Sequence, residues 1–285
     1  MKAYLDTNIL RQLNKIPENT GAELICSQLG VMELISGMTS ESEFAIRRSA
    51  LANIKSRNVS VIWESTATLQ SKAFALDISD YDVPATKMLM DALIQTNTLA
   101  EAEKIGIDLG GNTYSIATFV SYDNMLVDDS VEVFSGTSKI SKEDRKFLRD
   151  SSYCVHIIDR HVELIASNFL KEYGVEKSSD RYAKSIEHFN RFGTLQNYMR
   201  CLASYTLDAM EGGGPPGRND GFDIAHLAYT DDIDLFVSND KIYRRLKQEL
   251  YSVKFITFDE FACHFLRFSC WASPKNNCAP FMWNR

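Results

Sequence analysis

The chain has 285 residues, of which 45% are hydrophobic and 24% are charged, and its formal net charge is −7. This composition is typical of a soluble globular protein with a substantial core, built as one large domain or as a domain with a large insertion. The negative charge argues against a protein that coats nucleic acid or an anionic membrane electrostatically. No signal-peptide pattern opens the chain, and no run approaches the about 20 apolar residues of a membrane span, so we expect a cytoplasmic protein without a membrane partner.

The first part of the chain predicts alternating strands and helices. A short apolar run ends at Asp6, which is how a buried parallel strand presents a carboxylate at its carboxyl edge. Ser27 is the expected N-cap of a helix that contains Glu33. The expected elements are a strand that ends at residue 5, a strand over 23–26, helices over 28–38 and 41–57, and a strand over 59–63.

The middle of the chain, from residue 65 to about residue 208, is mainly helical in texture. Ser141 and Asp144 form a pattern that resembles a capping box, and a long helical passage is expected over 179–210. The run over 211–217 is rich in Gly and Pro, which resist regular structure, so it marks a linker. We interpret much of this passage as material added to an α/β unit.

After the linker, helices and strands alternate again. The expected elements are a compact helix over 224–229, a strand over 234–240, a basic amphipathic helix over 241–250, a strand over 253–257 and a helix over 258–265. Such alternation predicts an α/β fold in which right-handed crossovers join parallel strands.

Four acidic residues are expected at one edge of this sheet. Asp6 and Asp240 each follow a buried strand, Asp223 lies in the first turn of the helix that leads to the Asp240 strand, and Glu33 lies on the helix after the second strand. Ligands bind at the carboxyl edge of open α/β sheets. Converging carboxylates repel one another unless a cation is present, and Mg²⁺ and Mn²⁺ prefer oxygen ligands. The arrangement therefore predicts a metal site.

Each acid also has a purely structural interpretation. Asp220 and Asp223 have the spacing of an N-cap and its third-position partner. Asp6 and Asp240 can each cap a turn after a strand, and Glu33 can be a solvated helix residue. For any single residue the structural interpretation is at least as good. Three strand-associated acids in the same relation to one sheet edge favour a common site.

The ordered motifs of the chain resemble those of PIN-domain nucleases. The motifs are Tyr4-Leu5-Asp6-Thr7-Asn8, Val31-Met32-Glu33-Leu34-Ile35-Ser36-Gly37, Asp223-Ile224-Ala225-His226-Leu227-Ala228-Tyr229 and Phe236-Val237-Ser238-Asn239-Asp240. The resemblance implies a PIN-like three-layer fold, in which helices flank a parallel β-sheet. The implied division is a nuclease domain over 1–65 and 217–266, a mostly helical insertion over 66–216 and a C-terminal tail over 267–285.

The resemblance also implies the chemistry of the site. The catalytic and metal-binding positions fall on Asp6, Glu33, Asp223 and Asp240, with Mg²⁺ or Mn²⁺ as the cofactor. Asn8 takes a supporting position that steadies Asp6, and Ser238 takes the small hydroxyl position two residues before the last acid. Asp220 competes with Asp223 for the third acidic position. The implied reaction is attack by a metal-activated water on a phosphodiester bond, leaving a 5′-phosphate and a 3′-hydroxyl. We expect an endonuclease whose substrate is single-stranded RNA.

Substrate binding has to overcome the negative net charge, so basic residues near the acids are candidates for holding phosphates. The candidates are Lys241, Arg244 and Arg245 on the expected helix over 241–250, and Arg218 on the linker. The alternative is a solvated helix face paired with Glu249. A weaker second group consists of Arg47, Arg48, Lys55 and Arg57.

Other function classes are left open. A PIN-like module that only binds RNA or a protein partner has no need of four mutually repelling carboxylates, so their presence favours an enzyme. The run over 105–113 resembles the phosphate loop of sugar kinases and actin-like ATPases, but no second phosphate motif accompanies it. A haloacid-dehalogenase-type phosphatase needs a second aspartate where Asn8 stands. A homo-oligomer or a protein partner is also left open.

Overall fold

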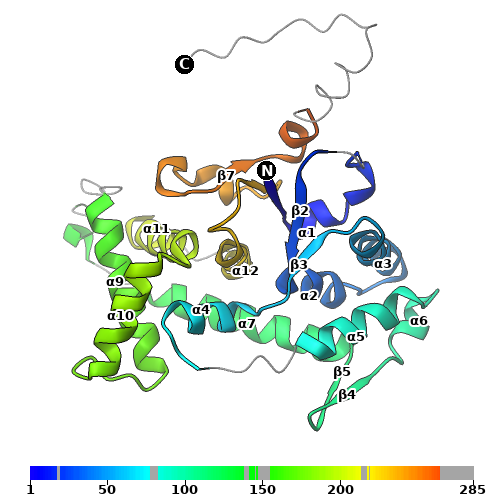
Figure 1. Ribbon diagram of the computed structural model, residues 1–285, viewed down its shortest axis with the longest axis horizontal. Coiled ribbons are helices and arrows are strands. Elements are labelled where there is room, and N and C mark those ends of the chain that lie inside the picture. Colours follow the sequence, from blue (N-terminus) through cyan, green and yellow to red (C-terminus); the bar gives the residue numbers. More distant parts are fainter. Residues whose placement is uncertain are drawn as a thin grey trace, which may run out of the picture.

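A parallel five-stranded sheet forms the centre of the computed structural model (Figure 1). The structure describes residues 1–17, 20–77, 83–137, 141–144, 146, 155–212, 217 and 219–263. The strand order is β3-β2-β1-β6-β7, and helices flank the sheet. The strands are β1 (Lys2–Leu5), β2 (Glu23–Ser27), β3 (Ser60–Ile62), β6 (Leu235–Val237) and β7 (Lys254–Ile256). The predicted α/β class and its parallel sheet are confirmed.

The strand order reverses direction at β1. From β1 the chain passes to β2 and β3 on one side, and it returns much later to place β6 and β7 on the other side. The register sets Tyr4 opposite both Ile25 and Phe236, so β1 is hydrogen-bonded along both edges. In open α/β sheets, ligands bind outside the carboxyl ends of the strands at such a reversal. The residues that follow β1 and β6 are therefore candidates for a binding site.

Side chains of the central strand alternate between two hydrophobic cores. Tyr4 points into a core shared with α4 and α9 to α12, whereas Ala3 and Leu5 point into a core shared with α1, α2, α3 and α5. The helices are α1 (Thr7–Leu10), α2 (Gln28–Ser36), α3 (Glu41–Ser56), α4 (Thr66–Ala73), α5 (Val83–Ile94), α9 (Val155–Glu172), α10 (Asp180–Phe192), α11 (Gln196–Gly212) and α12 (Asp220–Ala225).

Helix starts agree with the sequence where a side chain caps them. Ser27 accepts a hydrogen bond from the Gly30 backbone N–H, as predicted for the N-cap of α2. The predicted helical passage over 179–210 starts at its Ser179 cap but divides into α10 and α11. Gly193 adopts the left-handed conformation that commonly ends a helix, with φ at 61°.

The predicted helix over 241–250 is wrong. This segment forms two short 3-10 turns, η3 (Tyr243–Arg245) and η4 (Gln248–Leu250). Tertiary hydrogen bonds hold the backbone in this form. The Tyr243 hydroxyl donates to the Asp223 carbonyl at 2.6 Å, and the Gln248 amide bonds the backbone of Val253 and Phe255 beside β7. Local helix propensity is outweighed by these contacts.

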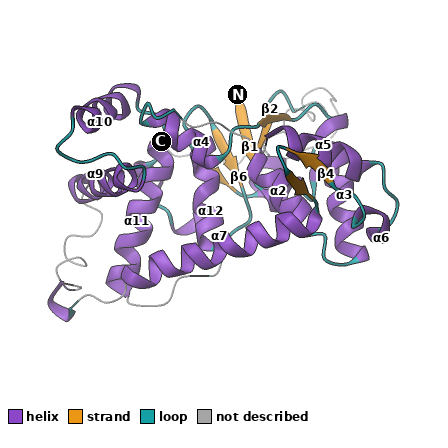
Figure 2. Ribbon diagram, turned by 90° about the horizontal axis from the view of Figure 1, so that it is seen from below, coloured by secondary structure: helices purple, strands orange, loops and turns teal. Residues whose placement is uncertain are grey.

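The segment between β3 and α9 adds a hairpin and a long helix. Its elements are α6 (Leu99–Ala102), the antiparallel strands β4 (Ile107–Leu109) and β5 (Asn112–Tyr114), and α7 (Ile116–Thr137). The Gly-rich run that resembles a phosphate loop forms this hairpin, with Gly110 and Gly111 at positive φ. Figure 2 shows α7 crossing the molecule, where it packs against α2, α12 and α11. The boundaries of the predicted insertion stay a prediction.

Two further observations complete the fold. Of the described helices, none combines the length and apolarity needed to cross a bilayer. The predicted C-terminal tail over 267–285 lies outside the described residues.

Asn197 joins the helical segment to the loops around β6 and β7, which makes it a test of the fold. Its buried amide donates to the Thr230 carbonyl at 3.2 Å and to the Ser252 hydroxyl at 2.9 Å, and it accepts from the Ser252 N–H at 3.0 Å. We expect Asn197→Ala to lower the free energy of unfolding in urea by about 1–3 kcal/mol, because buried polar partners lose their bonds.

The matched control is Asn190→Ala on the exposed surface of α10, which we expect to change this free energy by less than about 0.5 kcal/mol. Equal effects of the two substitutions would contradict the role assigned to Asn197.

Candidate active site

A cavity of about 300 Å³ lies at the carboxyl edge of the sheet, beside the strand reversal. All four predicted acids line it. Asp6 follows β1, Glu33 comes from α2, Asp223 from the first turn of α12, and Asp240 from the loop after β6. The other lining residues are Thr7, Asn8, Arg11, Ser36, Gly37, Arg47, Asp123, Val127, Asn219 and Phe222. The expected convergence of the four acids is observed, and their catalytic and metal-binding roles stay predictions.

Asp6 is the most deeply buried of these acids, with 2% of its surface exposed. Its Oδ1 atom accepts from the Thr7 backbone N–H at 2.7 Å, so Asp6 is the N-cap of α1. Its Oδ2 atom accepts from Asn8 Nδ2 at 2.9 Å and from Ser238 Oγ at 2.5 Å. Asp6 therefore caps a helix, as the structural interpretation of the sequence allowed, and it also lines the cavity.

Asn8 and Ser238 join Asp6 to Asp240. Asn8 Nδ2 donates to Asp240 Oδ2 at 2.6 Å, while Asn8 Oδ1 accepts from the Asn239 backbone N–H at 3.2 Å. Ser238 Oγ accepts from the Asp240 backbone N–H at 3.0 Å. Both side chains therefore contact Asp6 and fix the orientation of two carboxylates. Their supporting roles stay predictions.

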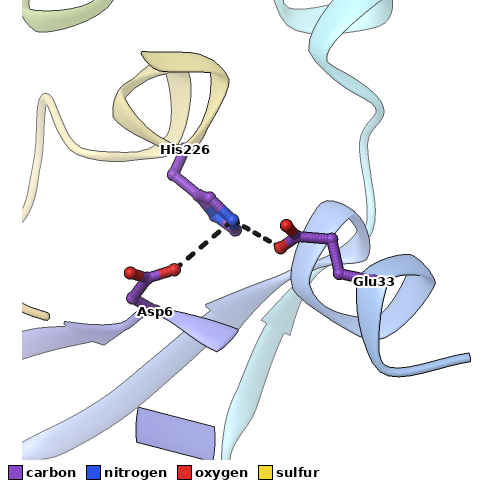
Figure 3. A group of neighbouring side chains, drawn as sticks. All are labelled: Asp6, Glu33 and His226. Atoms are coloured by element: carbon purple, nitrogen blue, oxygen red, sulfur yellow. Dashed lines mark hydrogen bonds and ion pairs between the residues drawn. The ribbon is translucent and has the colours of Figure 1, made fainter. Parts of the chain in front are cut away.

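His226 lies between Glu33 and Asp6 (Figure 3). Its Nε2 atom is 2.7 Å from Glu33 Oε2 and 3.5 Å from Asp6 Oδ1. Its Nδ1 atom is 2.6 Å from the Tyr4 hydroxyl, which in turn is 2.6 Å from Ser27 Oγ. His226 was not among the predicted site residues. The signal that could have found it is its spacing of three residues from Asp223, which puts both side chains on one face of a helix.

Glu33 is held from two sides. Its Oε2 atom also accepts a hydrogen bond from the Thr7 hydroxyl, and 23% of its side chain is exposed. The alternative interpretation, in which Glu33 is a solvated helix residue, is therefore wrong.

Burial, with a smaller contribution from neighbouring carboxylates, raises the pKa of two carboxyl groups. Burial raises the pKa of Asp6 to about 7, with the His226 charge opposing the rise and the Glu33 charge adding to it. Burial, followed by the Asp6 and Asp240 charges, raises the pKa of Asp223 to about 8. Burial and mutual repulsion therefore disfavour the charged form of both carboxyls, and a cation nearby would favour it.

His226 carries the compensating positive charge. Its burial disfavours the imidazolium, but the Glu33 and Asp6 carboxylates outweigh that effect and raise the pKa of His226 to about 9. Burial likewise disfavours the Glu33 carboxylate, but His226 and the hydrogen bond from Thr7 outweigh it and lower the pKa of Glu33. At neutral pH, His226 and Glu33 therefore form a buried ion pair.

Two arginines and a fifth acid complete the cavity. Arg11 and Arg47 both pair with Glu43, at 3.0 and 2.8 Å, and Arg47 also donates to the Glu33 carbonyl at 2.7 Å. Asp123 comes from α7. Arg47 belonged to the weaker group of basic candidates, whereas Arg11 and Asp123 were missed. Arg11 is the C-cap of α1, close to Asp6 in the sequence, whereas tertiary packing of α7 brings Asp123 to the cavity.

The other predicted residues lie elsewhere. Asp220 accepts hydrogen bonds from the Tyr205 hydroxyl and, at 2.8 Å, from the Gly217 N–H, and it does not line the acidic cavity. Arg244 lines a separate hollow that also contacts Asp240, whereas Lys241 and Arg245 are exposed and do not line the acidic cavity. Their expected common helical face does not form, because no helix covers 241–250. Arg218 lies outside the described residues.

The donor atoms present suit a hard divalent cation. Carboxylate oxygens of Asp6 and Glu33 lie within 4.8 Å of each other, and Asp223 and Asp240 border the same cavity. The protonated His226 offers no ligand atom, so a cation there has to be held by the carboxylates. Carboxylate oxygens are the preferred ligands of Mg²⁺ and Mn²⁺. After burial, the charges of neighbouring carboxylates also raise the pKa values of Asp6 and Asp223, so a cation bound among these groups would relieve their mutual repulsion.

No protein-family model, no curated protein and no solved structure matches this chain. The description of the site thus rests on its own geometry and chemistry.

The charges of the site predict how the stability of the metal-free protein depends on pH. A carboxyl with a raised pKa binds its proton more tightly in the folded state, so Asp6 and Asp223 destabilise the fold as the pH rises from about 4 to 8. The raised pKa of His226 stabilises the fold below pH 6.5, and this contribution is lost as the pH rises through 9. In EDTA, we expect the thermal midpoint to fall by roughly 4–8 °C between pH 6 and pH 9.

Asp223→Asn removes one of the three groups, so it should raise the midpoint at pH 9 and reduce this slope. The matched control is Asp128→Asn on the exposed surface of α7, which should leave the slope unchanged. A midpoint of the native chain that is flat or rises over this range would contradict this balance of charges.

Proposed function

We propose that this chain is a metal-dependent nuclease with a PIN-like fold, which hydrolyses phosphodiester bonds in single-stranded nucleic acid. One observation carries the proposal. Four carboxylates from β1, α2, α12 and the loop after β6 border one cavity at the strand reversal of a parallel sheet. A phosphodiester carries a negative charge, so it can enter this cavity only with cations that offset the repulsion.

The cofactor of the proposal is Mg²⁺ or Mn²⁺, held by carboxylates of Asp6, Glu33, Asp223 and Asp240. A divalent cation bound there supplies Lewis-acid charge and lowers the pKa of a water molecule toward neutrality. The chemistry of the donor set supports the assignment, because oxygen ligands dominate and two of the carboxyls have pKa values raised by burial and mutual repulsion.

The protein's own residues position and balance charge in this proposal. Asn8 and Ser238 fix the Asp6 and Asp240 carboxylates by hydrogen bonds of 2.5 to 2.9 Å. Arg11 and Arg47 border the same cavity and offer guanidinium groups to phosphate oxygens. Both arginines are held by Glu43, so their positions are set before a substrate arrives. RNA as the preferred substrate, and 5′-phosphate and 3′-hydroxyl product ends, follow from the family resemblance.

A second candidate function is a PIN-like module that binds RNA or a protein without catalysis. The observation that favours it is His226, whose charge lies between Asp6 and Glu33 and partly takes the place of a cation. Among the described residues, Asp223 and Asp240 make no ion pair with His226. The His226 charge lowers the pKa of Asp223, but burial and the Asp6 and Asp240 charges outweigh it, which favours the enzyme. A phosphatase or kinase has no comparable support, because the Asn8 amide holds two carboxylates where phosphatase chemistry needs an acid.

The test uses a variant that removes charge without removing a described side-chain bond. Purified native chain and Asp223→Asn are incubated with single-stranded RNA and DNA oligonucleotides in Mg²⁺ or Mn²⁺, and the product ends are mapped. We expect the native chain to cleave, with EDTA abolishing cleavage, and Asp223→Asn to be slower by about 100-fold or more. The Asp128→Asn control should cleave at the native rate.

Equal rates for the native chain and Asp223→Asn would contradict the assignment of the acids. No cleavage by the native chain in either metal, combined with retained RNA binding, would support the non-catalytic module instead.

A further inference from the structure

A second hollow lies directly beside the acidic cavity. It has a volume of about 260 Å³, and we call it the aromatic hollow. Its lining residues are Gln28, Leu29, Met32, Ser65, Thr66, Ala67, Gln70, Tyr122, Leu126, Tyr198, Gly221, Phe222, Ala225 and Tyr229. The buried side chain of Phe222 borders both the aromatic hollow and the acidic cavity. The two spaces are therefore adjacent compartments.

Two helices divide the compartments with successive residues. On α7, Tyr122 and Leu126 line the aromatic hollow, while the residues that follow each of them, Asp123 and Val127, line the acidic cavity. On α12, Gly221 and Asp223 line the hollow and the cavity respectively, on either side of the shared Phe222. Figure 2 shows α7 running beside α12, and the two helices pack against each other. The two compartments therefore border the same pair of helices, and Phe222 is the residue that they share.

Uncharged residues line the aromatic hollow, whereas charged residues line the acidic cavity beside it. No Asp, Glu, Lys, Arg or His is among the described residues that line it, whereas the acidic cavity is bordered by five acids and two arginines. Four aromatic rings line the hollow, from Tyr122, Tyr198, Phe222 and Tyr229. An ion would lose its hydration there without a charged partner, so phosphates and cations are poor occupants.

Polar groups in the hollow are placed to recognise a hydrogen-bonding edge. Gln70 Nε2 donates to the Tyr198 hydroxyl at 3.1 Å, which orients the Gln70 amide. The Thr66 and Tyr229 hydroxyls are 3.3 Å apart. Amide and hydroxyl groups beside aromatic faces suit a neutral planar ring with donors and acceptors on its edge. A nucleobase has these properties, and bases stack on aromatic side chains in complexes with single strands.

We propose that the aromatic hollow binds one unpaired nucleobase of the strand whose phosphate lies in the acidic cavity. This inference rests on the proposed nuclease function and adds to it a base-binding subsite. A base in a duplex is stacked and paired, so only a single-stranded or extruded base can enter. Tyr122 is at the mouth of the hollow with 41% of its surface exposed, so its ring is the one that a base meets first.

The experiment measures how octanucleotides bind to the full chain carrying Asp223→Asn, which slows cleavage. Fluorescein-labelled oligouridylate and oligoadenylate are used, together with a series in which a single abasic site is moved along the octamer. We expect Tyr122→Ala to weaken binding of the intact octamers by about tenfold. One abasic position should cost a similar factor, and the two losses should not add, because both remove the same stacking contact.

The matched control is Met125→Ala, an exposed residue on α7 that lines neither compartment and that should leave binding unchanged. Native affinity of Tyr122→Ala, or additive losses at every abasic position, would overturn the inference even if the native chain cleaves RNA. If the native chain does not cleave, but the affinity losses from Tyr122→Ala and from the abasic site are not additive, the nuclease function is contradicted and the base-binding subsite is supported. Absence of octamer binding would overturn the base-binding subsite, whereas the cleavage assay with the native chain decides on the nuclease function separately.

Discussion

The burial of a carboxylate at the end of β1 is the constraint on which the rest of the site depends. Asp6 is only 2% exposed. Three hydrogen bonds and a nearby imidazolium stabilise its carboxylate in the interior. His226 supplies that positive charge. Its Nδ1 atom forms a hydrogen bond with the hydroxyl of Tyr4 in the middle of β1. The hydrophobic core and the acidic site are therefore joined through one buried chain of polar groups, which has to be fully satisfied to be stable.

The fold brings the acids together because strands distant in sequence are neighbours in the sheet. Leu5 pairs with Val237, so the residues that follow them, Asp6 and Ser238, come into contact. The long passage between β3 and α12 is not remote from this edge. Its helix α7 adds Asp123 and Val127 to the acidic cavity and Tyr122 to the aromatic hollow. The passage that the sequence left without a role thus forms part of the walls around the site.

Sequence patterns predicted what local chemistry determines and missed what packing determines. The strand ending before Asp6, the Ser27 cap and the convergence of four acids were predicted, because apolar runs, caps and parallel order are encoded locally. The helix over 241–250 was wrong, since the bonds of Gln248 to β7 override propensity. His226 was passed over because a histidine on an apolar helix is usually a packing residue. Asp123 reaches the cavity only through contacts of α7 with other helices, which no single segment reveals. Arg11 ends the helix that Asp6 caps, and it was missed although it is close to Asp6 in the sequence.

We propose that the acids at the end of β1 and β6 form a cation site. The most direct measurement is anomalous X-ray scattering from a crystal of the full chain soaked in Mn²⁺ at pH 8. A cation site predicts an anomalous peak within the acidic cavity, in contact with carboxylate oxygens of Asp6, Asp223 and Asp240. An empty cavity, with His226 still bridging Asp6 and Glu33 and no manganese peak beside these carboxylates, would contradict it.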